Sequence, residues 1–310
     1  MINNNSKIYV AGHNGMVGSS VIRKLRSQGF NNLIFENSKK LDLRKQNDVG
    51  DYINENKPEV IINAAAVVGG IIANDSYPYK FLLDNMLIQN NLIDTAVKNK
   101  VENFIFLGSS CIYPRDADQP LKEEYLLTSK LENTNQWYAL AKISGVKLIE
   151  AVRKVHGYNY VSLMPTNLYG QNDNFDLETS HVLPALIRKF HEAKIQNKNV
   201  IIWGTGKPKR EFLHVDDLAE VIFFFLNNKA KEYLYNIGSG QEVTIKELGQ
   251  IIKEITKFNG DIIFDKKYPD GTPRKLLDSS KIRDFGWQPK INLRNGIQNV
   301  YRDFLKAQNI

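Results

Sequence analysis

Short apolar runs alternate with amphipathic stretches through the first half of the chain. The first run spans residues 7–11 and leads through a turn rich in glycine into an amphipathic stretch at residues 19–28. Later apolar runs lie at residues 32–36, 60–66, 104–109 and 160–164, and helical patterns lie at residues 86–98 and 138–155. Such alternation is typical of parallel strands that helices cover on both faces. The pattern predicts an α/β fold with a doubly wound parallel sheet.

After residue 170 the pattern becomes mixed. A helix is predicted at residues 183–194, a strand at 200–203 and a helix from Asp216 onward. The most apolar stretch, residues 221–226, is far shorter than the about 20 residues that a membrane-spanning helix needs, so we interpret it as part of a buried helix. We expect a first domain over residues 1–170 and a smaller α/β lobe over residues 171–310, with segments at about 210–235 crossing back to the sheet.

The composition is that of a globular protein. Of 310 residues, 42% are hydrophobic and 24% are charged, which gives no reason to expect disorder. The net charge of +7 comes from 41 basic and 34 acidic residues that are scattered along the chain, without the basic run of a nucleic-acid-binding arm. One cysteine excludes an intrachain disulfide, and the first residues resemble no signal peptide. We expect a cytoplasmic protein without nucleic-acid, membrane or metal partners.

The turn after the first apolar run carries three regularly spaced glycines. Gly12, Gly15 and Gly18 stand between a predicted strand and a predicted helix, where glycine permits a tight turn and the close approach of a pyrophosphate. The N-terminus of the helix then directs N–H donors toward the phosphates. For such a motif taken alone, a turn without a ligand is the alternative. In this strand and helix context, the motif indicates a Rossmann-type dinucleotide-binding domain.

The end of the second predicted strand bears on the choice of cofactor. A carboxylate about 20 residues after the glycines favours the free 2′-hydroxyl of NAD, and Glu36 occupies this position. Lys39, Lys40 and Arg44 follow, and their cations suit the 2′-phosphate of NADP. These residues leave both cofactors open.

A tyrosine and a lysine in the helix predicted at residues 138–155 are candidates for proton transfer. Tyr138 and Lys142 are four residues apart, so both side chains lie on one face of the helix. We expect the ammonium group to lower the pKa of Tyr138 from about 10 toward neutrality. Ser109 ends a predicted strand, where its hydroxyl can hold a substrate oxygen at the carboxyl edge of the sheet. A packed tyrosine and a solvated lysine are the alternative.

Five segments together carry a more specific signal than any single motif. They lie at residues 11–18, 107–114, 165–170, 180–186 and 210–217. In this order they resemble the extended short-chain dehydrogenase/reductase family, specifically the GDP-L-fucose synthase family within it, over nearly the whole chain. The resemblance implies an enzyme that epimerises C3 and C5 and reduces C4 of GDP-4-keto-6-deoxy-D-mannose, giving GDP-L-fucose.

The resemblance also implies a role for each candidate catalytic residue. Ser109, Tyr138 and Lys142 match the reductase triad, in which Tyr138 delivers a proton to O4 while C4 receives a hydride. Cys111 and His181 match the base and the acid of the epimerisation. The chemistry is consistent, because removal of the C3 or C5 proton beside a C4 ketone gives an enolate that hydroxyl groups can stabilise. Without the resemblance, a small buried cysteine and a structural histidine are the alternatives.

Two sets of binding residues follow from the same resemblance. The cofactor set comprises Gly12, His13, Asn14, Gly15, Met16, Val17, Gly18, Glu36, Ser38, Lys39, Asp42, Leu107, Gly108, Lys142, Pro165, Asn167, Leu168 and His181. The substrate set comprises Asn167, Val182, Lys189, Trp203, Arg210, Asp270 and Lys275. Arginine and lysine suit the diphosphate of a GDP-sugar, and Trp203 offers a stacking face. Ordinary surface charge and core packing are the alternatives for the second set.

The resemblance to a reductive family favours NADP(H). The relatives carry arginines where this chain has Asn14 and, near the second strand, Glu36 and Ser38, so NAD(H) stays open. Family members are commonly homodimers, which requires an exposed apolar helix pair on the first domain.

Three other functions stay open. The first is C4 reduction, with or without epimerisation, of another GDP-4-keto sugar such as a deoxyheptose or a colitose precursor. The second is an NAD-retaining sugar-nucleotide epimerase or 4,6-dehydratase, which Glu36 supports, although Ser110 and Cys111 replace the acidic pair that dehydration uses. The third is a dinucleotide-binding sensor without turnover, against which the three triad residues argue.

Overall fold

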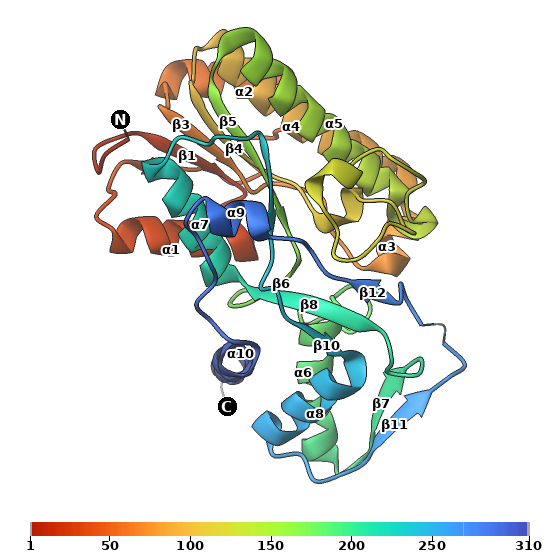
Figure 1. The fold of residues 1–310 in the computed structure, drawn as a ribbon. Helices are drawn as coiled ribbons and strands as arrows, with labels where there is room; N and C mark the ends of the chain where they lie inside the picture. Colours follow the sequence, from red (N-terminus) through yellow and green to blue (C-terminus); the bar gives the residue numbers. More distant parts are fainter. Residues whose placement is uncertain (1, 269, 309–310) are drawn as a thin grey trace.

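A six-stranded parallel sheet forms the centre of the larger lobe of the protein (Figure 1). The computed structural model describes residues 2–268 and 270–308. The strands, in spatial order, are β2 (Leu33–Ile34), β1 (Ile8–Ala11), β3 (Val60–Asn63), β4 (Asn103–Leu107), β5 (Asn159–Pro165) and β9 (Leu234–Ile237). The chain leaves β1 toward β2 and then crosses to β3 on the other side of β1. This reversal places a topological switch point at the carboxyl end of β1, where open α/β sheets bind their ligands.

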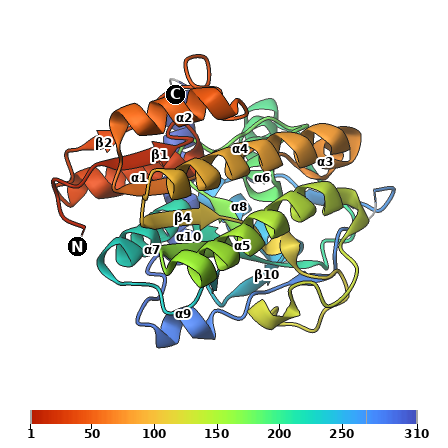
Figure 2. The same cartoon turned by 90° about the horizontal axis from the view of Figure 1, so that it is seen from above.

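The alternation of side chains along the strands divides the core between the two faces of the sheet. Ile8 and Val10 pack against α1 (Met16–Ser27) and α7 (Val215–Asn227). Tyr9 and Ala11 point to the opposite face, which is covered by α2 (Gln46–Asn56), α4 (Pro78–Lys98) and α5 (Gln136–His156). Figure 2 shows α4 and α5 running side by side over this face. The predicted doubly wound α/β fold is confirmed.

The second lobe is smaller and contains short strands. One sheet contains β10 (Glu242–Thr244), β8 (Lys209–His214), β12 (Arg274–Lys275) and β6 (Asn167–Tyr169), and a separate pair contains β7 (Val200–Trp203) and β11 (Ile262–Asp265). The helices α6 (Val182–Gln196), α8 (Ile245–Thr256) and α10 (Leu293–Ala307) enclose a third core cluster with these strands. The chain returns to the large sheet through α7, β9 and α9 (Ser280–Asp284). The domain boundary at residue 170 stays a prediction.

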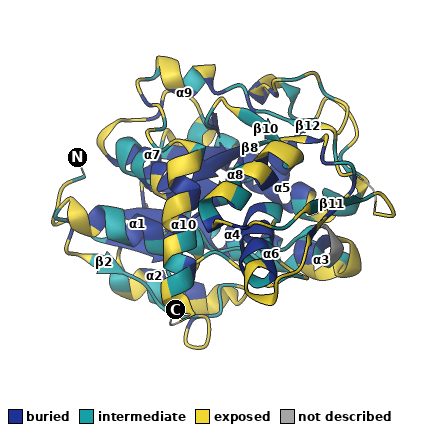
Figure 3. Ribbon diagram, turned by 90° about the horizontal axis from the view of Figure 1, so that it is seen from below, coloured by how far each residue is buried: buried dark blue, intermediate teal, exposed yellow. Residues whose placement is uncertain are grey.

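Burial follows the layered arrangement. Seen from below, the inner strands of the large sheet are buried while the outer faces of the helices are exposed (Figure 3). The apolar stretch at residues 221–226 lies in α7 and supplies core residues, as predicted. Among residues 2–268 and 270–308, no helix has the length and apolar character needed to cross a membrane.

Element boundaries differ from the predictions at two places. The second strand was expected at residues 32–36, but β2 contains only two residues, because it is an edge strand that pairs with Ile8 and Tyr9 alone. The helix expected from Met86 begins at Pro78, where the fixed φ of proline suits the first helical turn. The short helix α3 (Ile71–Ser76) precedes it.

Candidate active site

The glycine turn between β1 and α1 has the shape of a pyrophosphate cradle. Gly12 has a φ of +80°, and a Cβ there would lie 2.7 Å from the backbone nitrogen of Ala65. A Cβ at Gly18 would overlap the carbonyl oxygen of Gly12, whereas one at Gly15 would meet nothing closer than 3.5 Å. The first turn of α1 has no acidic residue and no side-chain cap, so its N–H groups are free to bind an anion. The turn therefore fits the dinucleotide that its sequence predicts.

The segment after β2 offers fewer cations than its sequence suggests. Glu36 Oε1 accepts hydrogen bonds from Asn37, and Lys40 Nζ lies 3.8 Å from Glu36 Oε2. Arg44 makes two hydrogen bonds of 2.9 Å to Asp42, which hold the pKa of that carboxyl down at about 2, and it also contacts Asp84. The hypothesis that Arg44 binds a 2′-phosphate is therefore not supported, because its guanidinium already has carboxylate partners.

Two exposed residues complete this segment. Ser38 and Lys39 are open to solvent beyond Glu36, and Asn14 is exposed in the glycine turn. The ring of His13 stacks on Phe35 with centroids 4.6 Å apart. Lys40 and Glu36 thus share a solvent-accessible corner, with the exposed Lys39 next in sequence, where the adenosine half of a dinucleotide would lie.

Tyr138 and Lys142 lie one turn apart on α5, beside the carboxyl end of β4. Lys142 is buried, and its Nζ donates a hydrogen bond of 2.9 Å to the carbonyl oxygen of Leu107. The same ammonium lies 4.9 Å from the centre of the Phe106 ring and 5.6 Å from that of Tyr138. Tyr138 packs edge-on against Phe81. The structure thus brings the phenol and the ammonium together, as the helical spacing predicts.

The expected lowering of the tyrosine pKa is wrong. Burial raises the pKa of Tyr138 above its usual value. Burial also lowers the pKa of Lys142 to about 8. Both shifts have one physical cause, since removal from water disfavours whichever form is charged. The phenol is consequently protonated at neutral pH, which is the form that a proton donor requires.

Ser109 and Cys111 follow β4 directly. Ser109 caps the short 3₁₀ helix η1 (Ser110–Ile112), and its Oγ accepts a hydrogen bond of 3.4 Å from the backbone N–H of Cys111. Cys111 is buried, and burial raises the pKa of its thiol, against which Lys275 and Lys142 act electrostatically. A serine hydroxyl and a thiol therefore lie on the turn that directly follows the part of β4 to which Lys142 is hydrogen-bonded.

His181 approaches from the other lobe. It forms the N-cap of α6 and remains accessible to solvent. Surrounding protein atoms and the cation of Lys275 lower the pKa of its imidazole. Lys275 lies in β12 beside β8, and it influences both Cys111 and His181. The two groups assigned by resemblance to epimerisation thus share one lysine neighbour.

The predicted substrate residues lie in the smaller lobe, on strands and helices except for Asp270, which lies in the loop between β11 and β12, and several have protein partners. Arg210 donates hydrogen bonds to the carbonyl oxygens of Lys209 and Thr272. Asp270 accepts hydrogen bonds of 2.8 and 2.6 Å from the backbone and side chain of Thr205. Asn167 donates to the carbonyl oxygen of Glu211 at 2.8 Å. We therefore expect Asp270 to act through the loop that it holds.

The remaining predicted positions surround these groups. Lys189 Nζ lies 4.9 Å above the Trp203 ring, and Val182 begins α6. Leu107 and Gly108 end β4 and follow it, Pro165 ends β5, and Leu168 lies in β6. Met16 and Val17 form the first turn of α1.

Two buried asparagines that the sequence analysis missed hold the loop after β3. Asn85 of α4 makes hydrogen bonds of 2.9 and 3.0 Å to the backbone of Val67. Asn74 donates to the carbonyl oxygens of Gly69 and Gly70, and Gly70 N–H donates to Thr179 near His181. The available signal was a polar residue at position 85 in the apolar stripe of α4 that contains Phe81 and Leu92.

Asp173 lies in the loop that leads to His181, and its burial predicts a measurable pH dependence of stability. Its Oδ2 is buried and has no hydrogen-bond partner among the described residues, and burial raises its pKa to about 7. A folded-state pKa above the unfolded value means that this group contributes stability at low pH and loses it as pH rises from about 4 to about 7. We expect Asp173→Asn to raise the melting temperature by a few degrees at pH 8 and much less at pH 5.

Asp176 provides the matched control in thermal melts between pH 5 and pH 8. Hydrogen bonds from Thr179 lower the pKa of Asp176, so Asp176→Asn is expected to lower the melting temperature at pH 8. A melting temperature of Asp173→Asn that follows the parent at every pH would show that the carboxyl is not destabilising.

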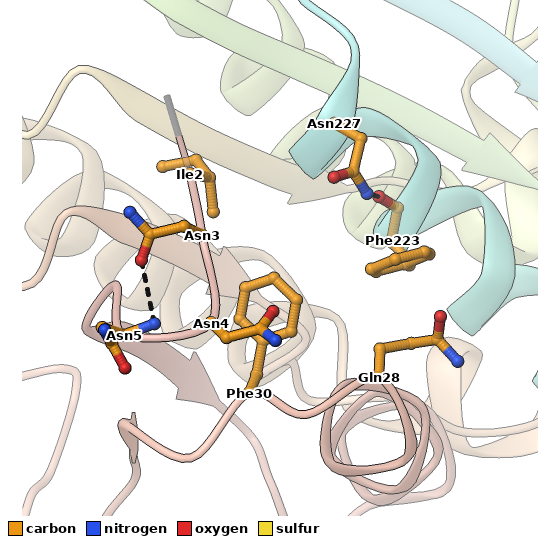
Figure 4. A pocket seen from close by; sticks show the side chains of 8 residues that line it. All are labelled: Ile2, Asn3, Asn4, Asn5, Gln28, Phe30, Phe223 and Asn227. Atoms are coloured by element: carbon orange, nitrogen blue, oxygen red, sulfur yellow. Dashed lines mark hydrogen bonds between the residues drawn. The ribbon is translucent and has the colours of Figure 1, made fainter.

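One hollow in the described structure lies away from this cluster. Its volume is about 490 Å³, and it is lined by the N-terminal segment, the end of α1 and the end of α7. Figure 4 shows its side chains, which are Ile2, Asn3, Asn4, Asn5, Gln28, Phe30, Phe223 and Asn227. None of these is an acid, base or nucleophile. Because α1 starts at the carboxyl edge of the sheet, its end marks the opposite edge, and the hollow is not part of the candidate site.

Comparisons with known proteins agree with the geometry. The family model described as "NAD dependent epimerase/dehydratase family" matches residues 8–238. The chain is 53% identical to "GDP-L-fucose synthase 1" of Arabidopsis thaliana over 307 residues, which cover 99% of this chain and 95% of the relative. It is 44% identical to the GDP-L-fucose synthase of Escherichia coli, with 97% of both chains covered.

A solved structure extends the comparison to a bound cofactor. The GDP-mannoheptose C4 reductase from Campylobacter jejuni with NADP bound superimposes with a TM-score of 0.91 at 38% identity, covering 98% of this chain and 99% of that one. The glycine turn, the Tyr138 and Lys142 pair and the sheet order are the features that such a fold requires. The chain therefore belongs to the NAD dependent epimerase/dehydratase family, in the branch that contains the GDP-L-fucose synthases.

Proposed function

We propose that this chain is an NADPH-dependent enzyme that epimerises C3 and C5 and reduces C4 of GDP-4-keto-6-deoxy-D-mannose to give GDP-L-fucose. The observation that carries the proposal is the cluster of Tyr138, Lys142, Ser109 and Cys111 at the carboxyl end of β4. This strand end is two strands from the glycine turn of β1, or about 10 Å. That separation suits a dinucleotide with its pyrophosphate on the turn and its nicotinamide beside Tyr138.

The reduction needs a proton at O4 as C4 accepts a hydride, which the bound NADPH supplies. Tyr138 is protonated in this environment and donates that proton. The ammonium of Lys142, fixed by the Leu107 carbonyl, stabilises the phenolate that results. The hydroxyl of Ser109 holds O4 by a hydrogen bond. General-acid catalysis of this kind contributes about 10²–10⁴-fold to the rate.

The epimerisation needs a base near C3 and C5 and an acid on the opposite face. Cys111 takes the proton as a thiolate, which is the minor form because burial raises the pKa of the thiol, and which the cations of Lys275 and Lys142 favour. The electrons move onto O4, where Ser109 and Tyr138 stabilise the enolate. His181, on the other lobe, returns a proton to the opposite face from its imidazolium form, which is the minor form because burial and Lys275 lower its pKa. One ketone therefore serves both reactions.

We propose NADPH as the reductant. The support is the NADP-bound relative and the exposed Lys39, which lies with Lys40 beside Glu36 and suits a 2′-phosphate. Initial rates measured with NADPH and NADH at matched concentrations decide the point, and a preference for NADH would overturn it.

We propose a homodimer that uses the outer face of α4 and α5. Exposed apolar side chains on this helix pair support it, since Tyr79 is 77% exposed and Leu140 is 40% exposed. Sedimentation equilibrium measures the mass, and a monomer at micromolar concentration would contradict the proposal.

The reaction in D₂O, followed by NMR of the product, tests the function. The parent enzyme is expected to consume one NADPH per sugar and to give GDP-L-fucose with deuterium at C3 and C5. Cys111→Ser is expected to incorporate no deuterium while C4 reduction continues more slowly. Deuterium incorporation at the parent rate in Cys111→Ser, or unaltered turnover in His181→Asn, would remove the assigned roles.

C4 reduction of a related GDP-4-keto heptose is the second candidate. The similarity to a GDP-mannoheptose C4 reductase favours it, and pockets distinguish one methylene-sized group by only about 1–3 kcal/mol. In that case the same experiment shows faster NADPH consumption with the heptose substrate and no deuterium in the product. An enzyme that retains NAD would consume no stoichiometric NADPH.

A further inference from the structure

The β7–β11 pair presents exposed apolar side chains beside the predicted substrate residues. The strands run parallel, with Ile201 opposite Ile263 and Trp203 opposite Asp265. Ile201 and Ile263 are about half exposed, and Trp203 is 47% exposed. Because the strands are parallel, their C-terminal ends lie at the same edge of the pair. The turn after Trp203 and the loop after Asp265 therefore lie next to each other (Figure 1).

Tyr268, in that loop, stacks on Trp203. The ring centroids are 4.5 Å apart and the planes differ by 14°, yet Tyr268 is 45% exposed. Two large rings that stack in solvent form a flat aromatic platform, which is suited to a third flat ring. The sequence analysis identified Trp203 but not Tyr268.

Hydrogen bonds at two points hold the loop that carries Tyr268. Asp270 accepts from the backbone and the hydroxyl of Thr205, which directly follows the Trp203 turn. The carbonyl oxygen of Thr272 accepts a hydrogen bond of 2.6 Å from Arg210. The carboxylate of Asp270 is already hydrogen-bonded to Thr205, so we expect this predicted substrate residue to act by holding the loop. These bonds hold the part of the loop that follows Tyr268, while Tyr268 itself rests on Trp203.

One cation contacts the platform and two more lie farther along the same loop. Lys189 Nζ lies 4.9 Å above the Trp203 ring. Arg210 and Lys275 occupy paired positions on β8 and β12, at the far end of the same loop. Flat aromatic rings followed by cations match a nucleoside diphosphate, whose base stacks and whose phosphates need positive charge.

We propose that Tyr268 is a base-binding residue, whose outer face stacks on the guanine of the GDP-sugar while its inner face packs against Trp203. This inference rests on the proposed function and adds a residue to its substrate site. The phosphates then point along the loop toward Arg210 and Lys275, and the sugar reaches the Cys111 cluster, on which Lys275 also acts.

Titration of the full-length protein with GDP tests the role without any reaction. Tyr268→Ala is expected to weaken GDP binding about 10-fold, within the range for loss of one base-stacking aromatic, whereas Tyr268→Phe keeps the ring and the affinity. Ile263→Ala removes a neighbouring exposed apolar side chain from the same strand pair and is expected to bind GDP as the parent does. In turnover, Tyr268→Ala raises KM for the GDP-sugar with little change in kcat.

The outcomes separate this inference from the function on which it rests. Equal GDP affinity in the parent and Tyr268→Ala overturns the role of Tyr268 and leaves the GDP-sugar site intact. A parent protein that binds no GDP overturns both. Equal weakening by Ile263→Ala and Tyr268→Ala shows a general loss of the surface and also overturns the stacking role. A thermal melt of each variant verifies that it is folded.

Discussion

Tyr138→Phe is expected to lower kcat about 10³-fold, the middle of the range for loss of a general acid. The substitution removes one oxygen and retains the ring that packs edge-on against Phe81. Lys142 keeps its bond to the Leu107 carbonyl, so the cofactor site should be undisturbed. The loss is therefore confined to the proton delivered to O4, and it appears in kcat and in kcat/KM alike.

Steady-state rates and an NADPH titration measure this result together. Tyr160→Phe is the matched control, because Tyr160 is fully buried in β5 and its hydroxyl donates to the carbonyl oxygen of Val101 at 2.8 Å, away from the cluster. It should lose about 1 kcal/mol of stability and no activity. If Tyr138→Phe turned over like the parent, or if Tyr160→Phe lost as much, the proton donor would have to be sought elsewhere.

Gly18→Ala is expected to abolish measurable NADPH binding. The added Cβ would overlap the carbonyl oxygen of Gly12 and lie 2.7 Å from the Cα of His13. Both are backbone atoms, so the methyl group fits only if α1 moves away from the turn. The N–H groups at the start of α1 then leave the phosphate position, and the packing of α1 on the sheet loosens as well. Calorimetric titration with NADPH and a thermal melt record the two effects.

Gly50→Ala is the control for this substitution. Gly50 lies in α2, and a Cβ there meets nothing within 4 Å, so alanine should gain about 0.5–1 kcal/mol of helix stability. Its NADPH affinity should equal that of the parent. Retained NADPH binding in Gly18→Ala would show that the turn tolerates a side chain and that the cradle is formed by other atoms.

The local pattern of apolar, polar and glycine positions was enough to predict most of the fold. The alternation of apolar runs and amphipathic stretches specifies the parallel sheet, because strands with a helix on each face must be apolar on both. The glycine spacing specified the cradle, since Gly12 and Gly18 have no room for a Cβ. The spacing of Tyr138 and Lys142 specified one shared helix face, which the structure retains. These are short-range properties that the order of residues alone determines.

Tertiary structure decided the properties that depend on distant partners. The pKa of Tyr138 rises rather than falls, because the phenol is buried, which the spacing along the helix does not reveal. Arg44 is held by Asp84 from α4 as well as by Asp42. Asp270 is held by Thr205, and Tyr268 meets Trp203 across 65 positions of sequence. Burial and long-range contacts arise only when the chain folds. The charge state of each group, and whether it already has a hydrogen-bond or ion-pair partner, therefore follow from the tertiary structure.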